Sequence, residues 1–481
     1  MSETLPSQHG CEWQSEAERL RAENAELKAQ KAALEKLVYG KKSEKLPRPT
    51  DELRKRGDIA PLDRDALTKK RAEKAEWKKQ LPEETVEHKV APPLPTCELC
   101  HGQPDHPMPP EISRQIDYIP ARAVVRRHVR QQLRCPCGSC IVTAPAPPRV
   151  GDQGMYGPGL VAHAVLAKCA DSMPLYRLAQ SLQRSGIPIS DATLGGLFHK
   201  AADLLRPLYA RMLVLIRAEL VVQADETRIQ VQAKQKTRRA WMWVFLSGQR
   251  IVYVFSPSRS GDTPVKVLGN STGALVVDAY TGYNAVCTPE MRERVGCLAH
   301  VRRKLFDAMA GAPEMRQALD LILEVYKVEH EARETGIMRS PKHREMRQAR
   351  SKPAMQKLHE WLSERQERYL PQEPAGKAIR YALNNWPHLT AFLDRPELPP
   401  DNNLSEGALR VIAKTRDASL FVGTDEAGEN LAVLMSLVQS AKAAGINPQE
   451  YLADVLVRVQ TWPSARVDEL LPENWSAGVA G

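Results

Sequence analysis

The chain has 481 residues, which is long enough for roughly two to four domains, each with its own core. Its 68 Lys and Arg residues outnumber its 58 Asp and Glu residues and give a net charge of +10, which favours a polyanionic partner. No stretch approaches the roughly 18 apolar residues of a membrane span, and residues 1–10 lack the features of a secretory signal. We therefore expect a multi-domain cytoplasmic protein without a membrane partner.

The first predicted element is a charged helix within residues 12–46. Leucines recur every seven residues in a stretch without Gly or Pro, namely Leu20, Leu27 and Leu34. With these leucines at d positions, Asn24 and Lys31 occupy a positions, where polar residues weaken a coiled coil but fix its register. A coiled-coil (leucine-zipper) homodimer is favoured over a lone charged helix. A charged linker, in part helical, follows over residues 47–92.

Five of the nine cysteines form two tight groups within residues 93–148. The first group is Cys97 and Cys100, and the second is Cys135, Cys137 and Cys140. Two close pairs around a strand-like stretch are typical of a zinc ribbon, in which four thiolates hold structural Zn2+. Cys137 and Cys140 have the usual spacing for the second pair, and Cys135 is the alternative ligand. A chain without an export signal also favours metal binding over disulfides.

The stretch between the two cysteine groups is basic and contains Arg126, Arg127 and Arg130. These side chains suit contact with DNA phosphates. They could equally form the solvated face of a strand.

Residues 149–215 are predicted to form a helical DNA-binding region. A helix, a turn at residues 186–188 and a second helix follow one another, with Ser190 as a natural N-cap and Thr193 in the first turn. This is helix-turn-helix geometry, in which the second helix can enter a major groove, so Ser190 and Thr193 are candidate DNA contacts. Helical hairpins that bind nothing are more frequent, so the pattern alone does not decide.

From residue 216 the hydrophobic pattern changes to that of strands. Apolar segments within 219–232, 239–248, 250–261 and 273–286, with a short helix at 262–270, predict an α/β sheet that contains one antiparallel hairpin. Asp225 and Asp278 each follow an apolar run of a strand. Alternating aromatic residues on one strand are interpreted as core rather than as a base-stacking platform: Trp241, Trp243 and Phe245.

Glu406 lies near the start of a predicted helix, in DNNLSEGALR (401–410), and has two interpretations. In the first, Asn403 caps the helix and Glu406 reaches back to the amide of the cap residue. In the second, the helix packs on the sheet and brings Glu406 to Asp225 and Asp278. Three carboxylates would then hold Mg2+ together with water and phosphate oxygens, and two such ions support an in-line phosphoryl displacement.

Several motifs carry a resemblance to a known family. They are LVYGKKSEKL, the cysteine-paired segment, PLYRLAQSLQRSGIPISDATL, VVQADET, VVDAYTGYN, GCLAHVRRKLFD, DNNLSEGALR and LFVGTDEAGENLAVLMSLVQSAKAAGINPQEYLADVL. In this order they make the chain similar to IS66 family transposases over nearly its whole length. The resemblance implies an RNase H-like catalytic domain over residues 216–425, with a helical insertion at about 313–395. It also implies a DDE triad, which by motif is Asp225, Asp278 and Glu406.

The fold class that follows is multi-domain α/β plus α, with a C-terminal helical segment at 426–470. The resemblance implies DNA cleavage at the ends of an insertion sequence by metal-activated water, with Mg2+ or Mn2+ as cofactor. The freed 3′-hydroxyl then attacks target DNA. Partners would be double-stranded DNA, further copies of the chain and companion proteins of the same element, in a bacterial, nucleoid-associated setting.

Two departures from the family pattern motivate an alternative. Gly407 stands where family members usually carry Arg, and Asp417 in TRDASLF stands where a cation is expected. Gly in a first helical turn lowers helix propensity by up to about 1 kcal/mol relative to Ala. The alternative is therefore a weakened or inactive transposase relic that only binds DNA. A nuclease that cuts without strand transfer is a third possibility.

The predicted helix at 297–310 contains Cys297 and His300, which share one side of the helix. Two candidate ligands do not make a zinc site, and packing in the core or near the active site is favoured. The cations that follow are plausible phosphate contacts near Asp278, although such a run is more often solvated: Arg302, Arg303 and Lys304.

Two further charged residues adjoin the predicted triad. Glu226 follows Asp225 directly and would point to the opposite face of the strand, so it is excluded from the triad. Arg410 lies four residues after Glu406 and is expected to pair with it along the helix.

Overall fold

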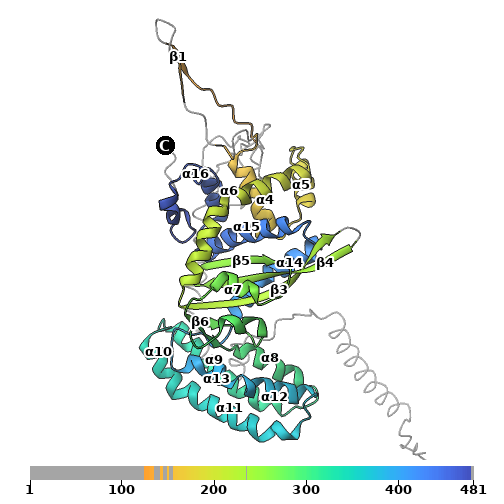
Figure 1. Cartoon of the computed structure of the whole chain (residues 1–481), viewed down its shortest axis with the longest axis vertical. Helices are drawn as coiled ribbons and strands as arrows, with labels where there is room; N and C mark the ends of the chain where they lie inside the picture. The colour runs from red at the N-terminus through yellow and green to blue at the C-terminus, as the bar shows by residue number, and fades with distance from the viewer. Residues whose placement is uncertain (1–123, 135–140, 145–148, 151–154, 234–235, 478–481) are drawn as a thin grey trace, which may run out of the picture. The chain divides into compact units, whose positions relative to one another are not determined.

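The computed structural model describes residues 124–134, 141–144, 149–150, 155–233 and 236–477 (Figure 1). All of them belong to one compact unit, residues 116–481. Several predictions fall outside the described residues: the coiled coil at 12–46, the linker at 47–92, and the zinc ligands Cys97, Cys100, Cys135, Cys137 and Cys140. The predicted domain boundaries stay predictions.

A short antiparallel pair of strands lies in the range predicted to be a zinc ribbon. It consists of β1 (Gln132–Arg134) and β2 (Ile141–Thr143), with Leu133 opposite Val142. The residues from 124 to 131 form no strand, so the strand is much shorter than the basic stretch suggested.

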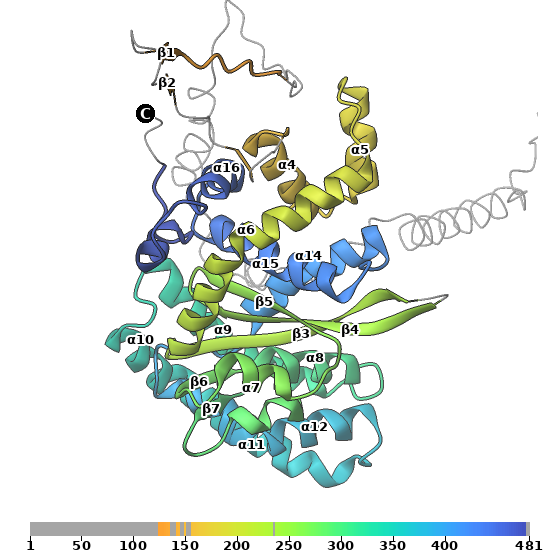
Figure 2. The same ribbon diagram turned by 45° about the horizontal axis from the view of Figure 1, so that its top comes forward.

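A five-stranded mixed sheet occupies the centre of the unit (Figures 1 and 2). Its strands are β3 (Val221–Ala233), β4 (Lys236–Ser247), β5 (Arg250–Ser256), β6 (Gly273–Val276) and β7 (Arg292–Val295). The order across the sheet is β5-β4-β3-β6-β7. The β4–β5 hairpin is antiparallel, as predicted. Strand β3 also pairs antiparallel with β4, while β6 and β7 run parallel to β3.

The centre of the sheet is buried on both faces. Trp243 and Phe245 of β4 are fully buried, with their rings stacked at 6.5 Å between centroids, which confirms the interpretation of these aromatics as core. Strand β7 was not predicted, because it is only four residues long and three of its residues are charged. One of them, Arg292, is 1 % exposed and donates to the main-chain oxygens of Ala274, Arg217 and Glu219.

Helices from both ends of the described chain cover one face of the sheet (Figure 2). They are α4 (Pro158–Cys169), α5 (Leu175–Arg184), α6 (Asp191–Ala218), α14 (Asn403–Ser419), α15 (Asp425–Ala443) and α16 (Pro448–Arg458), followed by the 3-10 helix η6 (Ser464–Leu470). Side chains of α4, α6, the sheet, α14, α15 and α16 contribute to one hydrophobic core. The C-terminal helices match the predicted helical segment, and Gly445, where φ is +76°, forms the turn between α15 and α16.

The edge strand β5 is covered by α15. The hydroxyl of Ser440 accepts a hydrogen bond from the amide of Ile251, and that of Ser436 accepts one from the amide of Tyr253, at 2.9 and 2.8 Å. These bonds satisfy the main-chain donors that an edge strand would otherwise leave free. The helix approaches so closely that a Cβ at Gly428 would lie 2.5 Å from the ring of Phe255.

The remaining helices lie on the opposite side of the sheet and beyond β7 (Figure 1). They are α7 (Asp262–Leu268), α8 (Leu298–Ala308), α9 (Met315–Glu334), α10 (Pro341–Met346), α11 (Lys352–Arg365), α12 (Pro374–Asn384) and α13 (Trp386–Thr390). A π-helical segment, η3 (Arg347–Ser351), joins α10 to α11. Three short 3-10 helices complete the set: η2 (Thr281–Val286), η4 (Gln366–Arg368) and η5 (Ala391–Leu393). The predicted helical character of residues 313–395 is therefore confirmed.

Helices α8, α9, α11, α12 and α13 form a second hydrophobic core together with side chains of β6 and β7. A buried ion pair stabilises this region: Arg347 donates to both carboxylate oxygens of Glu329 at 2.7 Å. The same guanidinium donates to the main-chain oxygens of Phe392, Arg395 and Leu398, and so fixes the segment that leads to α14. Among the described residues, no helix is both long and apolar enough to span a membrane.

Candidate active site

The sheet topology brings Asp225 and Asp278 to the same level of two neighbouring strands. Strands β3 and β6 are parallel, and Gln223 pairs with Val276. Asp225 and Asp278 each follow two residues later. The third carboxylate, Glu406, lies in the first turn of α14, and α14 packs on β3.

The three carboxylates interact electrostatically. The pKa of Asp225 is raised from its ordinary value of 3.8 to about 7, mainly because the side chain is removed from water. The negative charges of Glu226, Asp278 and Glu406 raise it further, while a hydrogen bond from the amide of Glu226 opposes the shift. Negative charges that act on one buried carboxylate in this way attract a cation.

Helix α14 is tied to β3 near both of its ends, which fixes Glu406 relative to Asp225. At the first end, the side-chain amide of Asn402 donates to the main-chain oxygen of Ala224 at 2.7 Å, and Asn402 is 1 % exposed. At the other end, Arg416 donates to the main-chain oxygen of Arg228 at 3.0 Å. Val422, just beyond the helix, exchanges main-chain hydrogen bonds with β3.

The segment that carries Asp278 is held by hydrogen bonds to its main chain. Arg294 of β7 donates to the main-chain oxygen of Asp278 at 2.7 Å and also contacts that of Tyr280. The amide of Tyr280 donates to the carboxylate of Asp278 at 2.9 Å. Gly282 is required in the turn that follows, since a Cβ there would lie 2.2 Å from the ring of Tyr280.

Glu226 lies within electrostatic reach of Asp225 and Asp278 but has hydrogen-bond partners of its own, and its exclusion from the triad stays a prediction. Its carboxylate accepts from Arg259 at 2.6 and 2.8 Å and from the hydroxyl of Tyr283 at 2.7 Å. Burial raises the pKa of Glu226, and these two partners oppose the shift. The guanidinium of Arg259 also lies 3.9 Å from the ring centroid of Tyr280, so the network supports the segment after Asp278.

The carboxylate of Glu406 points to α8 and does not cap its own helix. Its Oε2 accepts from Arg303 at 2.9 Å, and its Oε1 lies 3.7 Å from Nδ1 of His300. Helix α14 begins at Asn403, and its N-cap is Asn402. The predicted capping contact of Glu406 is therefore wrong. The predicted ion pair with Arg410 is also wrong, because Glu406 pairs with Arg303 of a neighbouring helix.

Cys297 and His300 lie beside Glu406. Cys297 is the N-cap of α8, is 1 % exposed, and its sulfur accepts a hydrogen bond from the amide of Asn402 at 3.2 Å. One donor atom each from Cys297, His300 and Glu406 lie within 4.8 Å of one another. The predicted burial of Cys297 is confirmed, and the structure adds Glu406 as a third side chain beside Cys297 and His300.

The predicted DNA contacts have different environments. Ser190 caps α6 as predicted: its hydroxyl accepts from the amide of Thr193 at 3.1 Å and bonds the Thr193 hydroxyl at 2.9 Å. Of the α8 cations, Arg302 is half-buried, Arg303 pairs with Glu406, and Lys304 lies 4.7 Å from the ring centroid of Tyr381.

Three of the arginines predicted to contact DNA phosphates lie in the range predicted to be a zinc ribbon. Arg126, Arg127 and Arg130 are all exposed, and Arg130 donates to the main-chain oxygen of Ala144 at 2.7 Å. Their exposure suits phosphate contact, but nothing in the described residues tests it.

Sequence reasoning missed the residues that position the carboxylates, above all Asn402, Arg294 and Arg259. Asn402 lies four residues before Glu406 in the same motif, so its position in the sequence could have indicated a role near Glu406. Arg294 lies in the strand that was not predicted. Nothing local to Arg259 indicates that it binds Glu226, because the contact spans 33 residues of chain.

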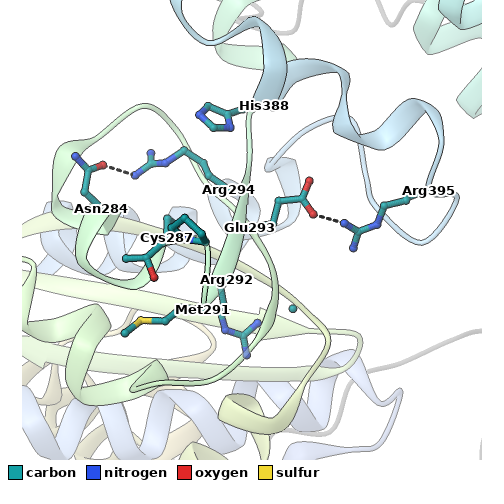
Figure 3. A pocket seen from close by; sticks show the side chains of 11 residues that line it. Asn284, Cys287, Met291, Arg292, Glu293, Arg294, His388 and Arg395 are labelled. Carbon is teal, nitrogen blue, oxygen red and sulfur yellow. Dashed lines mark hydrogen bonds and ion pairs between the residues drawn. The ribbon is translucent and has the colours of Figure 1, made fainter.

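A cavity of about 650 Å3 lies beside the edge strand β7 (Figure 3). Its charged side chains have partners: Arg294 donates to Asn284, and Arg395 pairs with Glu293. His388 also lines it, and burial, followed by the charge of Arg294, lowers the pKa of this imidazole. The cavity is therefore a weaker candidate than the carboxylate site.

Comparison with protein families gives three matches along the chain. Residues 153–430 match the IS66 transposase family, residues 436–472 match the IS66 C-terminal element, and residues 95–138 match the zinc-finger binding domain of IS66 transposases. The last match supports structural zinc in this range. It includes Cys97, Cys100, Cys135 and Cys137 and ends before Cys140, so the choice of the fourth ligand stays open.

Similar curated proteins occur in Sinorhizobium fredii, and they are themselves uncharacterized. The chain is 34 % identical to protein y4jD over 414 residues, which cover 82 % of this chain and 80 % of the relative. It is 27 % identical to y4hP, with 86 % and 79 % covered, and 28 % identical to y4qI, with 83 % and 77 % covered. Since the transposase match alone spans more than half of the chain, the protein belongs to the IS66 family of transposases.

Proposed function

We propose that this transposase cuts DNA at the ends of its insertion sequence and joins the freed ends to target DNA, with Asp225, Asp278 and Glu406 as its catalytic carboxylates. The observation that carries the proposal is the parallel pairing of β3 with β6, two residues before Asp225 and Asp278, together with the packing of α14, which carries Glu406, on β3. The mixed five-stranded sheet is compatible with the RNase H-like core that the family resemblance implies.

The donor set fits Mg2+ or Mn2+. Both ions prefer oxygen ligands, and Mg2+ is commonly held by few carboxylates together with water and substrate phosphate. Oε1 of Glu406 is buried and has no hydrogen-bond partner, so this oxygen is available to a cation. When bound, the metal ions would supply an activated water and stabilise the leaving oxygen.

The protein's own side chains would position the reacting groups. Asn402 holds Glu406 near Asp225, and Arg294 holds the main chain at Asp278. Arg303 forms a hydrogen bond to Glu406 and is largely exposed, so it can turn toward a DNA phosphate when a cation takes its place at the carboxylate. Arg302 and Lys304 on the same helix are the further phosphate contacts that we propose.

A coupled cleavage and joining assay tests the proposal. The protein, with the companion proteins of its element, is incubated with labelled element ends and Mg2+. We expect joined product from the unchanged chain and none from Glu406→Gln or Asp225→Asn, with end binding retained. Glu426→Gln, at an exposed carboxylate of α15, is the matched control and should act like the unchanged chain. Cleavage by Glu406→Gln would remove Glu406 from the mechanism.

The relic alternative rests on Gly407 and Asp417, and both are exposed. TRDAS forms the last part of α14, so Gly407 and Asp417 lie on the same helix. A Cβ at Gly407 would meet no atom within 4 Å, so a larger side chain fits there.

We predict that Gly407→Arg increases end cleavage several-fold, because it adds a cation next to Glu406 and raises helix propensity by up to about 1 kcal/mol. Gly407→Ala separates the two effects, since it restores helix propensity without charge. The relic alternative would be favoured if the unchanged chain binds the element ends without cutting them and the Gly407→Arg variant does not cut them either.

A further inference from the structure

A mixed set of metal-binding donors lies next to the carboxylate site. Cys297 is the N-cap of α8, His300 lies in the first turn of that helix, and Glu406 comes from α14. Their closest donor atoms, a thiol sulfur, an imidazole nitrogen and a carboxylate oxygen, all lie within 4.8 Å of one another. This is the one group of three or more such donors among the described residues.

Two of the three donors lack hydrogen bonds. Nδ1 of His300 and Oε1 of Glu406 are buried without partners, 3.7 Å apart. Buried polar atoms are normally satisfied, so these two atoms need either a charge pair with each other, through a protonated imidazole, or a ligand that binds both. The other oxygen, Oε2, is held by Arg303, and this bond turns Oε1 toward His300.

We propose that Cys297, His300 and Glu406 form a site for a thiophilic divalent ion such as Zn2+. Thiolate and imidazole ligands favour zinc, whereas Mg2+ favours oxygen, so this donor set selects a different ion from the carboxylate site. A fourth position would be left for water. The amide of Asn402, which donates to the sulfur, would hold the thiolate in place, as outer contacts do in metal sites.

The geometry needs only a small contraction. Zinc binds sulfur at about 2.3 Å and nitrogen or oxygen at about 2.0 to 2.2 Å, which places tetrahedral ligands roughly 3.3 to 3.7 Å apart. The proposal requires rotation of the His300 and Glu406 side chains to close the difference from 4.8 Å. Arg303 opposes a cation here, but its side chain is 58 % exposed and can move into solvent.

The site shares Glu406 with the carboxylate set, and this consequence rests on the proposed function. An ion held by Cys297 and His300 would draw Glu406 away from Asp225 and Asp278. Zinc would then inhibit Mg2+-dependent cleavage, and the inhibition would weaken when Cys297 is replaced.

Metal uptake by the full chain tests the site without DNA. The unchanged protein and Cys297→Ser are titrated with Zn2+ against a chromophoric chelator, and with Co2+ while thiolate-to-metal charge-transfer absorption is recorded. The predicted zinc ribbon is present in both proteins, so only the difference counts. We expect Cys297→Ser to bind about one ion fewer and to lose part of the cobalt absorption. The matched control Cys287→Ser, at a half-buried free cysteine near β7, should behave like the unchanged chain.

His300→Gln provides a second variant if Cys297→Ser does not fold, and it should also bind about one ion fewer. Equal uptake by the unchanged chain and by folded Cys297→Ser or His300→Gln would overturn the proposal. Metal uptake is measured independently of catalysis. A chain that does not cut DNA can still bind an ion at Cys297 and His300 and lose it on mutation, and a chain that cuts DNA can fail to bind that ion.

Discussion

Asp225 carries a pH dependence that follows from its surroundings. In the folded chain without Mg2+ its pKa is about 7, mainly through burial, against an ordinary value of 3.8 that applies to the unfolded chain. Between these two pH values the folded state holds a proton that the unfolded state has released. Stability from this group therefore falls as pH rises from about 4 to about 7, and the loss is complete above about pH 7.

We predict that Asp225→Asn raises the free energy of unfolding of the metal-free site at pH 8 but not at pH 4. The upper bound is about 4 kcal/mol, from the difference between the two pKa values. Urea unfolding of both proteins at the two pH values, in buffer without Mg2+ or Mn2+, measures the effect. Asp307→Asn, at an exposed carboxylate of α8, is the control and should show no such pH dependence. An equal effect of Asp225→Asn at both pH values would contradict the prediction.

Asn402 is predicted to be a positioning residue. Asn402→Ala removes the bond to the main-chain oxygen of Ala224, which leaves that buried oxygen without its partner and should cost about 1 to 3 kcal/mol. Because Glu406 then loses its fixed distance from Asp225, end cleavage should fall roughly 10- to 100-fold at unchanged end binding. Asn403→Ala, at the exposed neighbouring position, should change unfolding by less than about 0.5 kcal/mol. Equal effects of the two changes would mean that Asn402 has no special role.

At the scale of elements, the contact between α15 and β5 depends on two serine hydroxyls. Ser436 is fully buried and accepts from the amide of Tyr253. We predict that Ser436→Ala lowers the free energy of unfolding by about 1 to 3 kcal/mol, since it leaves a buried amide unpaired. Chemical unfolding measures the change, and Ser464→Ala, at an exposed serine of η6, should have almost no effect. A neutral Ser436→Ala would mean that water replaces the hydroxyl.

Helices and long strands were predictable because the repeat of apolar residues that marks each of them extends over only a few neighbouring positions. The hairpin of β4 and β5, the capped start of α6 and the helical region 313–395 follow from patterns within a few residues. Strand β7 was not predictable, because Arg292 lies in its interior and is buried only through main-chain oxygens supplied by other elements. The motif resemblance named Asp225, Asp278 and Glu406, but their coupling depends on the pairing of β3 with β6 and on the docking of α14. Neither the strand pairing nor the helix docking can be read from the spacing of these residues along the sequence.

At the scale of the whole molecule, parts that look separate in sequence share one core. Side chains of the predicted DNA-binding helices, the sheet and the C-terminal helices all enter it, among them Leu205 of α6, Trp243 of β4 and Leu434 of α15. The sheet that carries Asp225 is therefore supported by residues some 200 positions away, and a change in the C-terminal helices should reach the site through packing.

We predict that a chain ending at residue 425 does not form the native sheet. It lacks α15, α16 and η6, so β5 loses the partners of its Ile251 and Tyr253 amides, and the apolar face beneath α15 becomes exposed. Circular dichroism and limited proteolysis should show loss of cooperative unfolding and rapid cleavage within the sheet. A chain ending at residue 477 keeps all of these contacts and should unfold like the full chain. A cooperatively folded 1–425 chain would show instead that the α/β core is autonomous and that the C-terminal helices only dock on it.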